Sequence, residues 1–193
     1  MKSLIAQKKI NMMKWAKDLF PIPRSLTGKG NEETFKYIIK NINKKFKIKY
    51  VKSNTKVFDW KIPLQWEISD AYIKLPNGKK ICQFSKNNLH LVNYSSPIKK
   101  LISYKDLKKK IYFIKEKPNA IPYVTSYYKK NWGFCMTYNQ FQKLPKKGKY
   151  EISIDSKIFN GKMGSMDLMI PGKSKKEILI TSYICHPSMA NNE

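Results

Sequence analysis

The sequence predicts an α/β fold that is interrupted by a β-rich insert. Two segments near the N-terminus carry apolar residues at helical spacing, and the middle of the chain consists of short alternating segments between turn signals. Near the C-terminus an apolar run leads into a histidine, as a strand does at the carboxyl edge of an α/β sheet. We therefore expect N-terminal helices with a first strand in residues 1–59, the insert in residues 60–148, and the resumed sheet in residues 149–193.

Two helices and a strand are expected in the first of these divisions. The first helix runs up to Phe20, and Pro21 ends it because proline cannot continue a helix. A second helix is expected over residues 32–46, where Asn31 can cap the free N–H groups of the first turn. A strand follows over residues 47–57. The apolar stripe of the second helix comprises Phe35, Ile38, Ile39, Ile42 and Phe46.

Short strands separated by turns are expected in the insert and beyond it. Residues 70–75 and 80–84 form the arms of an expected β-hairpin, because the pair Asn77 and Gly78 favours a tight turn. Ser103 is placed to cap a short helix. Further strands are expected over residues 89–94, 120–128, 132–137, 150–155, 166–170 and 177–185, the last two joined by a turn at residues 171–174.

The charge of the chain comes almost entirely from lysine. The formal net charge is +26, from 39 Lys and Arg residues against 13 Asp and Glu residues, and Arg24 is the single arginine. A dedicated nucleic-acid surface would use arginine forks and clustered aromatic residues, whereas these lysines are spread along the whole length. The composition therefore favours non-specific, salt-dependent attraction to nucleic acid over specific recognition.

The cysteines indicate a reducing compartment. Cys82, Cys135 and Cys185 are odd in number and have no close pairing, which is typical of buried free thiols rather than of a disulfide framework. The N-terminus has no continuous apolar run of signal-peptide length, and no segment approaches the length of a transmembrane helix. We therefore expect a cytoplasmic protein with no membrane partner.

His186 is the stronger of the two histidines as a candidate for chemistry. It follows an apolar strand and precedes Pro187, so its ring would project into a loop where a neutral imidazole can ligate zinc and a nearby carboxylate can complete the shell. A surface or hydrogen-bonded loop histidine explains the same pattern. His90 lies in an alternating run and is given no catalytic role. Cys185 is expected to be a core thiol, because neighbouring strand residues point to opposite faces.

Arg24 is the other candidate site residue, because it alone carries a guanidinium in a lysine-dominated chain. A bidentate contact with a carboxylate of the protein or of a substrate would explain why lysine is not found there. Of these two, the structural salt bridge is the favoured interpretation, and chance retention of one arginine stays open beside them.

Six segments, in the same order along the chain, carry a resemblance to a known family. The segments are FPIPRSLTGKG (20–30), KVFDW (56–60), WEISDAYI (66–73), AIPYVTSYY (120–128), WGFC (132–135) and CHPSMANNE (185–193). On these segments the chain resembles a bacterial aminopeptidase-like family, once catalogued as a domain of unknown function. Its members resemble zinc aminopeptidases, contain an inserted β-rich domain and often end in a winged helix. The resemblance covers nearly the whole chain.

The resemblance implies a partial zinc-aminopeptidase-like fold, with the mixed sheet of the phosphorylase/hydrolase class, and a zinc cofactor. By this resemblance His186 matches the first metal-binding histidine, and Glu193 is the candidate carboxylate ligand, because Asn192 stands where many relatives have Asp. The general base and the later ligands of such enzymes lie downstream of the matched part. The implied function is that of the N-terminal fragment of a peptide hydrolase, acting on a peptide or aminoacyl substrate when complete and inactive alone.

Two other hypotheses stay open. The insert and its lysine surface would suit a non-enzymatic binding module for a polyanion or a protein partner, with binding that depends steeply on salt and not on zinc. A non-functional remnant would give no stable folded product. The oligomeric state is not predicted. For the peptidase fragment we expect exposed apolar edges in the α/β part, because the strands and helices that cover such a sheet would be missing.

Overall fold

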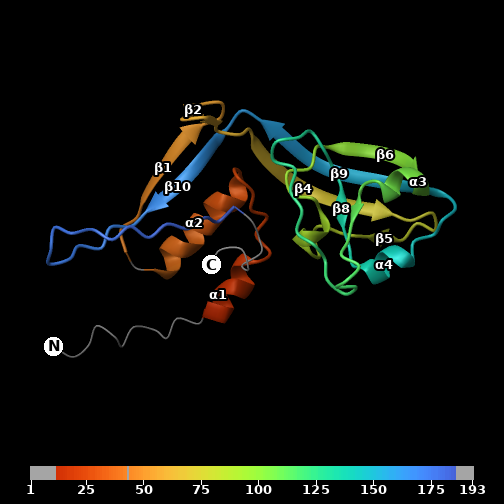
Figure 1. Cartoon of the computed structure of the whole chain (residues 1–193), viewed down its shortest axis with the longest axis horizontal. Coiled ribbons are helices and arrows are strands. Elements are labelled where there is room, and N and C mark those ends of the chain that lie inside the picture. The colour runs from red at the N-terminus through yellow and green to blue at the C-terminus, as the bar shows by residue number, and fades with distance from the viewer. Residues whose placement is uncertain (1–11, 43, 186–193) are drawn as a thin grey trace.

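A computed structural model describes residues 12–42 and 44–185 of the chain. The chain forms a mixed α/β structure with several small sheets, arranged as two adjoining regions (Figure 1). One region holds helices α1 (Met12–Leu19) and α2 (Lys29–Asn41) beside a ribbon of two long strands. The other region holds a four-stranded antiparallel sheet. The predicted α/β class is therefore confirmed as a mixed α/β structure with small sheets.

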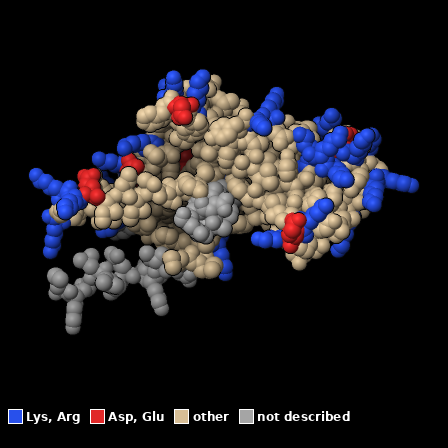
Figure 2. Space-filling model, viewed as in Figure 1, with Lys and Arg blue, Asp and Glu red and all other residues tan. Residues whose placement is uncertain are grey.

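Lysine side chains project from several parts of the surface. Figure 2 shows them mainly around the outline of the visible face, with a dense group at the end of the molecule that holds β6 (Ile98–Ser103) and α3 (Tyr104–Lys108). Acidic partners are few, because the sequence has 13 Asp and Glu residues against 39 Lys and Arg residues. In this view the positive charge is therefore spread over several elements rather than confined to one.

Helix α2 begins three residues earlier than its apolar stripe predicted and ends at Asn41, before the predicted end at residue 46. Gly28 precedes it with φ of 116°, and a Cβ at this position would lie 2.4 Å from the main-chain oxygen of Trp66. Only glycine fits this combination of backbone angle and close approach. Asn31 therefore does not cap the helix, because it lies inside its first turn, where its Nδ2 donates to the carbonyl of Ser25 at 2.8 Å.

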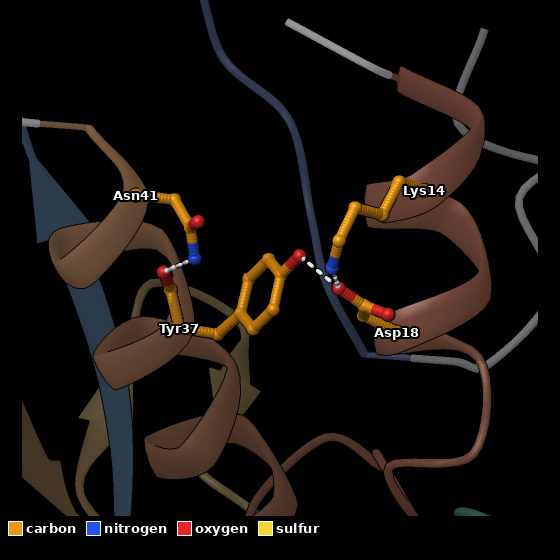
Figure 3. A network of polar contacts seen from close by, with 4 residues as sticks. All are labelled: Lys14, Asp18, Tyr37 and Asn41. Carbon is orange, nitrogen blue, oxygen red and sulfur yellow. Dashed lines mark hydrogen bonds and ion pairs between the residues drawn. The ribbon is translucent and has the colours of Figure 1, made fainter.

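A polar network joins α1 to α2 (Figure 3). The hydroxyl of Tyr37 donates to Asp18 Oδ2 at 2.7 Å, and Lys14 Nζ lies 2.6 Å from the same oxygen. The indole of Trp15 meets the ring of Tyr37 edge-on at 6.1 Å. The pKa of Asp18 is lowered, first by the hydrogen bond from Lys14 and then by that from Tyr37, whereas burial and the carboxylate raise the pKa of Tyr37 to about 12. Helix α1 thus depends on α2 for its position.

The four-stranded sheet has the order β5-β4-β9-β6, with β4 (Gln65–Lys74) and β9 (Lys149–Phe159) at its centre. The hairpin from β4 to β5 (Lys80–Ile81) has its turn at Asn77 and Gly78, as predicted, and Gly78 has φ of 84°. Strand β5 is shorter than expected because Cys82, with φ of 48°, leads the chain out of the sheet. The inner face of the sheet contributes the fully or almost fully buried Ala71, Ile73, Tyr150, Ile152 and Ile154.

Short elements surround this sheet. Strand β7 (Ile111–Tyr112) pairs in parallel with β8 (Phe134–Cys135), inside the predicted strand of residues 132–137. The predicted cap at Ser103 is confirmed, because its hydroxyl accepts a hydrogen bond from the main-chain N–H of Asp106 at the start of α3. Other short elements are β2 (Lys56–Val57), β3 (Trp60–Lys61), the 3-10 helix η1 (Asn88–His90) and α4 (Tyr138–Gln142).

Several predicted strands are wrong. Residues 89–94 form η1 and two isolated bridges instead of a strand, and residues 120–128 have a single bridge, between Thr125 and Asn93. Strand β1 (Lys47–Lys52) stops where Asn54 adopts φ of 67°, so the predicted strand of residues 47–57 is divided into β1 and β2. Strands β6 and β7 and helix α4 were not predicted.

The predicted strand over residues 177–185 is also wrong. These residues form no strand, and Ile178, Leu179 and Ile180 are 91%, 87% and 88% exposed. The physical reason is that β10 (Lys162–Asp167) pairs with β1, and no described strand lies beside residues 177–185 to accept their hydrogen bonds. Apolar residues are thus exposed in this segment, and the fragment status of the chain stays a prediction. The divisions at residues 60 and 148 stay predictions, and the pairing adds that β9 shares a sheet with β4 and β6.

Candidate functional site

The predicted metal ligands His186 and Glu193 lie outside the described residues, as does Asn192. Cys185 is the last residue described, and it directly precedes His186. The candidate functional site is therefore built from the described residues around Cys185, which fix where the chain enters the predicted metal loop. Arg24 is the one predicted site residue that the structure describes.

The main chain at Arg24 is held by a buried hydrogen-bond network. The side chain of Asn93 donates through Nδ2 to the carbonyl oxygen of Arg24 at 2.8 Å and accepts through Oδ1 from the Ser25 hydroxyl at 2.7 Å. Asn93 and Ser25 are 6% and 1% exposed. Because both side chains are polar and buried, each needs the other to satisfy its hydrogen-bonding groups. Asn93 thereby ties the segment before α2 to the β-rich region.

A second set of contacts attaches the same segment to β4. The Thr27 hydroxyl donates to the carbonyl of Leu64 at 2.9 Å and accepts from the main-chain N–H of Trp66 at 3.3 Å. The indole N–H of Trp66 in turn donates to the carbonyl of Ser95 at 2.9 Å. Residues 24–27 are thus fixed both at the Asn93 side and at the start of β4, which leaves little freedom for the position of Arg24.

The guanidinium of Arg24 interacts electrostatically with one phenol and one thiol. The residue is 5% exposed, and its electrostatic neighbours include Cys185 and Tyr123, from the terminal segment and from residues 120–128. Burial lowers the pKa of Arg24, while the interactions with Cys185 and Tyr123 favour its charged form. Buried charge is stable only when nearby groups compensate for lost water. The prediction that Arg24 meets a carboxylate stays a prediction.

Two tyrosines extend this cluster. The hydroxyls of Tyr123 and Tyr127 are 2.9 Å apart and share a hydrogen bond. Burial raises the pKa of both phenols, that of Tyr127 to about 12, so both are neutral at physiological pH. The tyrosines belong to a segment that the resemblance had singled out, but its alternating pattern predicted a strand and gave no sign of this cluster. Their four-residue spacing is the only sequence signal that links them.

The described residues provide no complete metal site. No group of three His, Cys, Asp or Glu side chains within residues 12–42 and 44–185 could hold a metal ion. Zinc would therefore depend on His186, on Glu193 and on further ligands, none of which is described. His90 is not available as a ligand through Nδ1, because this nitrogen lies 2.8 Å from the carbonyl oxygen of Cys135 and shares a hydrogen bond with it. His90 is thus a structural residue, although it does not lie in the predicted strand.

The three cysteines are free, as predicted. Burial raises the pKa of the Cys82 and Cys135 thiols to about 12, so both are inert core residues. Cys185 is half-buried, and burial raises the pKa of its thiol too, although the charge of Arg24 lowers it. A raised thiol pKa opposes nucleophilic attack, because the attack requires the thiolate. We therefore interpret Cys185 as a packing neighbour of Arg24.

Two cavities border this cluster. One, of about 540 Å³, lies where residues 179–185 pass over α2 and β10, and Asn31, Phe35 and Cys185 are among its lining residues. The other, of about 550 Å³, lies in the β-rich region and includes Tyr127 in its wall. The sequence patterns predicted neither cavity, because each is formed by segments that are far apart in the chain. Within the described ranges no helix has the length and apolar character needed to cross a bilayer.

Comparison with known proteins adds a family and relatives. Residues 65–157 match the model of a family that is described as a domain of unknown function (DUF2172). The matched range begins at β4 and ends in β9, so it covers the four-stranded sheet and its connections. The match is therefore to the β-rich region with its short helices α3 and α4, and not to α1, α2 or the terminal segment.

The similar proteins are longer than this chain. A protein of Clostridium acetobutylicum, named as a candidate polysaccharide biosynthesis protein with an aminopeptidase-like domain, is 45% identical over 175 residues, which are 91% of this chain and 40% of that protein. A crystal structure of a candidate peptidase from the same organism has a TM-score of 0.87 and 44% identity, covering 92% of this chain and 42% of that one. These matches support an aminopeptidase-like family of unknown function.

Proposed function

We propose that this chain is the N-terminal part of a zinc-dependent, aminopeptidase-like peptide hydrolase and that it hydrolyses no peptide alone. The observation that carries the proposal is the match at 45% identity to 40% of a protein whose name includes an aminopeptidase-like domain. The remaining part of such a protein would supply the groups that the described residues lack.

The Arg24 cluster supports this proposal by its position. Two anchors hold residues 24–27, and the same cluster receives Cys185, the residue before His186. A metal ligand is effective only when its supporting residues hold it in place. In this proposal, the role of Arg24, Tyr123 and Asn93 is to position the segment that enters the metal loop, without touching the reacting atoms.

Zinc would be held by His186 and Glu193 together with ligands from the remainder of the protein. When bound, it would supply the activation of a water molecule, whose pKa zinc lowers to about 7. With only these two candidate ligands in the sequence, the chain would bind zinc weakly, because catalytic zinc sites use three protein ligands. A carboxylate general base would also have to come from the remainder.

The test compares this chain with a protein extended through the downstream reading frame. Zinc content and aminoacyl-amide hydrolysis are measured for both, and we expect stoichiometric zinc and turnover only in the extended protein. In the extended protein, His186→Ala should abolish both signals. His90→Gln is the matched control, because it removes the other histidine and should leave zinc content unchanged.

An extended protein that binds no metal and hydrolyses no aminoacyl amide would overturn the proposal. Equal zinc loss in the two histidine variants would overturn the assignment of His186. Thermal unfolding of each variant is measured in parallel, because His90 contacts the main chain at Cys135 and its replacement also affects stability.

The lysine surface favours a second candidate function, a non-enzymatic module that binds a polyanion or a protein partner. The +26 net charge and the lysines across the surface in Figure 2 support it. Its signature would be binding that weakens steeply with salt and does not change when zinc is removed. Binding that instead requires the zinc-loaded extended protein would exclude this candidate.

A further inference from the structure

A cavity in the β-rich region has the features of a built ligand site. We call it the tyrosine–lysine cavity; its volume is about 550 Å³, which lies within the range of small-molecule pockets. Neither the matched family nor the relatives assign it a role. Lysines, tyrosines, one serine and several aliphatic or proline residues line it.

A buried hydroxyl at this cavity lacks a hydrogen-bond partner. Ser96 is 7% exposed, and its Oγ has no partner among the described residues. Its main-chain N–H already donates to the carbonyl of Asn131 at 2.8 Å, so the backbone of Ser96 is fixed. Buried polar groups without a partner are uncommon in folded proteins and indicate a missing ligand or water. The Ser96 hydroxyl is therefore available to a bound molecule.

Three lysines give the cavity positive charge. Lys61, Lys129 and Lys130 are all exposed, and none of them forms an ion pair with a described carboxylate. Three like charges at one cavity repel one another, and a bound anion relieves this repulsion. The charge of the site therefore selects a ligand with a carboxylate or another anionic group.

Most of the remaining lining is apolar, with Asn54 as a polar exception. Ile62, Pro63, Leu64, Pro97 and Ile158 contribute to the wall, and the ring of Tyr128 is 74% exposed. The hydroxyl of Tyr94 is occupied, because it donates to the carbonyl of Leu64 at 2.7 Å. An acidic sugar would need many hydrogen-bonding groups in the wall, whereas this wall suits an aliphatic or aromatic side chain.

The cavity adjoins the Arg24 cluster through one residue. Tyr127 lines the cavity, and its hydroxyl shares the hydrogen bond with Tyr123, which lies next to Arg24 and Cys185. The tyrosine pair therefore links the cavity wall to the neighbours of Arg24 and Cys185. The position fits a contact with a part of the substrate away from the predicted metal loop.

We propose that the tyrosine–lysine cavity binds a short peptide through an apolar side chain and a carboxylate next to it. The carboxylate lies among Lys61, Lys129 and Lys130 and accepts a hydrogen bond from Ser96, while the side chain packs on the apolar wall. This inference rests on the proposed function, because it names the class of substrate. The inference is tested by binding alone. The peptide-binding inference can therefore fail while the hydrolase proposal stands, and the hydrolase proposal can fail while peptide binding is found.

The experiment measures binding of three peptides to the 193-residue chain by titration calorimetry. The peptides are acetyl-Ala-Leu with a free carboxylate, the same peptide as its C-terminal amide, and acetyl-Glu-Leu amide. We expect the free acid to bind about tenfold more tightly than the amide, because one carboxylate meets three lysines. If acetyl-Glu-Leu amide binds tightly instead, the carboxylate that the cavity binds belongs to a side chain. If acetyl-Ala-Leu and acetyl-Glu-Leu amide both bind tightly, the cavity accepts a C-terminal or a side-chain carboxylate.

Variants separate the cavity from the general surface charge. Replacing Lys61, Lys129 and Lys130 together by Gln should remove the preference for the free acid and leave binding of the amide unchanged. The matched control replaces the exposed Lys115, Lys146 and Lys147 by Gln, which removes the same charge away from the cavity. Ser96→Ala should weaken the free acid about fivefold through one lost hydrogen bond. Thermal unfolding confirms that each variant is folded.

Four results would overturn the inference. The first is that no peptide binds, and the second is that acid and amide bind equally. The third is that the control variant loses the preference as fully as the cavity variant, which would leave only the charge of the whole surface. An acidic oligosaccharide that binds more tightly than every peptide would also overturn it, in favour of a glycan site.

Discussion

The Asn93 side chain offers the sharpest test of how the candidate site is held. Asn93→Ala removes two hydrogen bonds in one step, the donor to the Arg24 carbonyl and the acceptor for the Ser25 hydroxyl. The main-chain bonds of Asn93, to Val124 and from Ser126, involve other atoms and stay intact. The substitution therefore acts on the anchor of the Arg24 segment and leaves the surrounding backbone pairing in place.

The expected loss of unfolding free energy is about 3 kcal/mol. Each lost hydrogen bond contributes about 1 kcal/mol, and leaving a buried polar group without a partner adds to the cost. Two such groups are left, the carbonyl of Arg24 and the hydroxyl of Ser25, both on residues that are at most 5% exposed. The hydroxyl can rotate toward another acceptor, which keeps the total below the sum of the full penalties.

Urea unfolding measures this loss, with the change taken from the midpoint at constant slope. Asn139→Ala is the matched control, because its side chain makes an exposed hydrogen bond to Asn119, and its loss should stay within about 0.5 kcal/mol. Adding Ser25→Ala to Asn93→Ala should cost less than Ser25→Ala alone, by about 1 kcal/mol of coupling. A loss below about 1 kcal/mol in Asn93→Ala, or additive effects in the double variant, would refute the reasoning.

Three further outcomes are expected. Gly28→Ala should lower the free energy of unfolding by about 3 kcal/mol, and Gly78→Ala by about 1 kcal/mol. Both glycines have positive φ, but only a Cβ at residue 28 would collide with a main-chain carbonyl. Equal losses in urea titrations would contradict this. The lowered pKa of Asp18 predicts that its charged form contributes stability above the unfolded pKa of about 3.9, and that this stability is lost as pH falls through the folded pKa. The unfolding midpoint of Asp18→Asn should therefore decrease less than that of the unchanged protein as the pH is lowered. In the native protein, Cys185 should react with a thiol reagent before the two buried cysteines, and mass analysis of the labelled peptides would show the reverse order if the burial argument is wrong.

Local chemistry was enough to predict some elements. The hairpin turn at Asn77 and Gly78 and the cap at Ser103 depend on the backbone preferences and hydrogen bonds of a few adjacent residues, and the structure has both. The free state of the cysteines likewise followed from their number and spacing. These features need no information from distant parts of the chain.

The errors arose where distant residues decide the conformation. Residues 120–128 have the β-branched and aromatic pattern of a strand, but only Thr125 pairs, because the segment is held between Asn93 and the Arg24 cluster. Asn31 has the residue type of a helix cap, yet Gly28 begins the helix because its backbone must approach Trp66 closely. In both cases tertiary contacts overruled a local preference.

The sequence by itself determined the family resemblance, the α/β class and the candidates Arg24, His186 and Glu193, because these depend on residue identity and order. Only the tertiary structure decided that Arg24 lies beside Tyr123 and Cys185, and that Ser96 faces a cavity lined by three lysines. The physical reason is that burial and proximity are set by packing between segments far apart in the chain. A pattern read along one segment carries no information about which distant side chains will surround it.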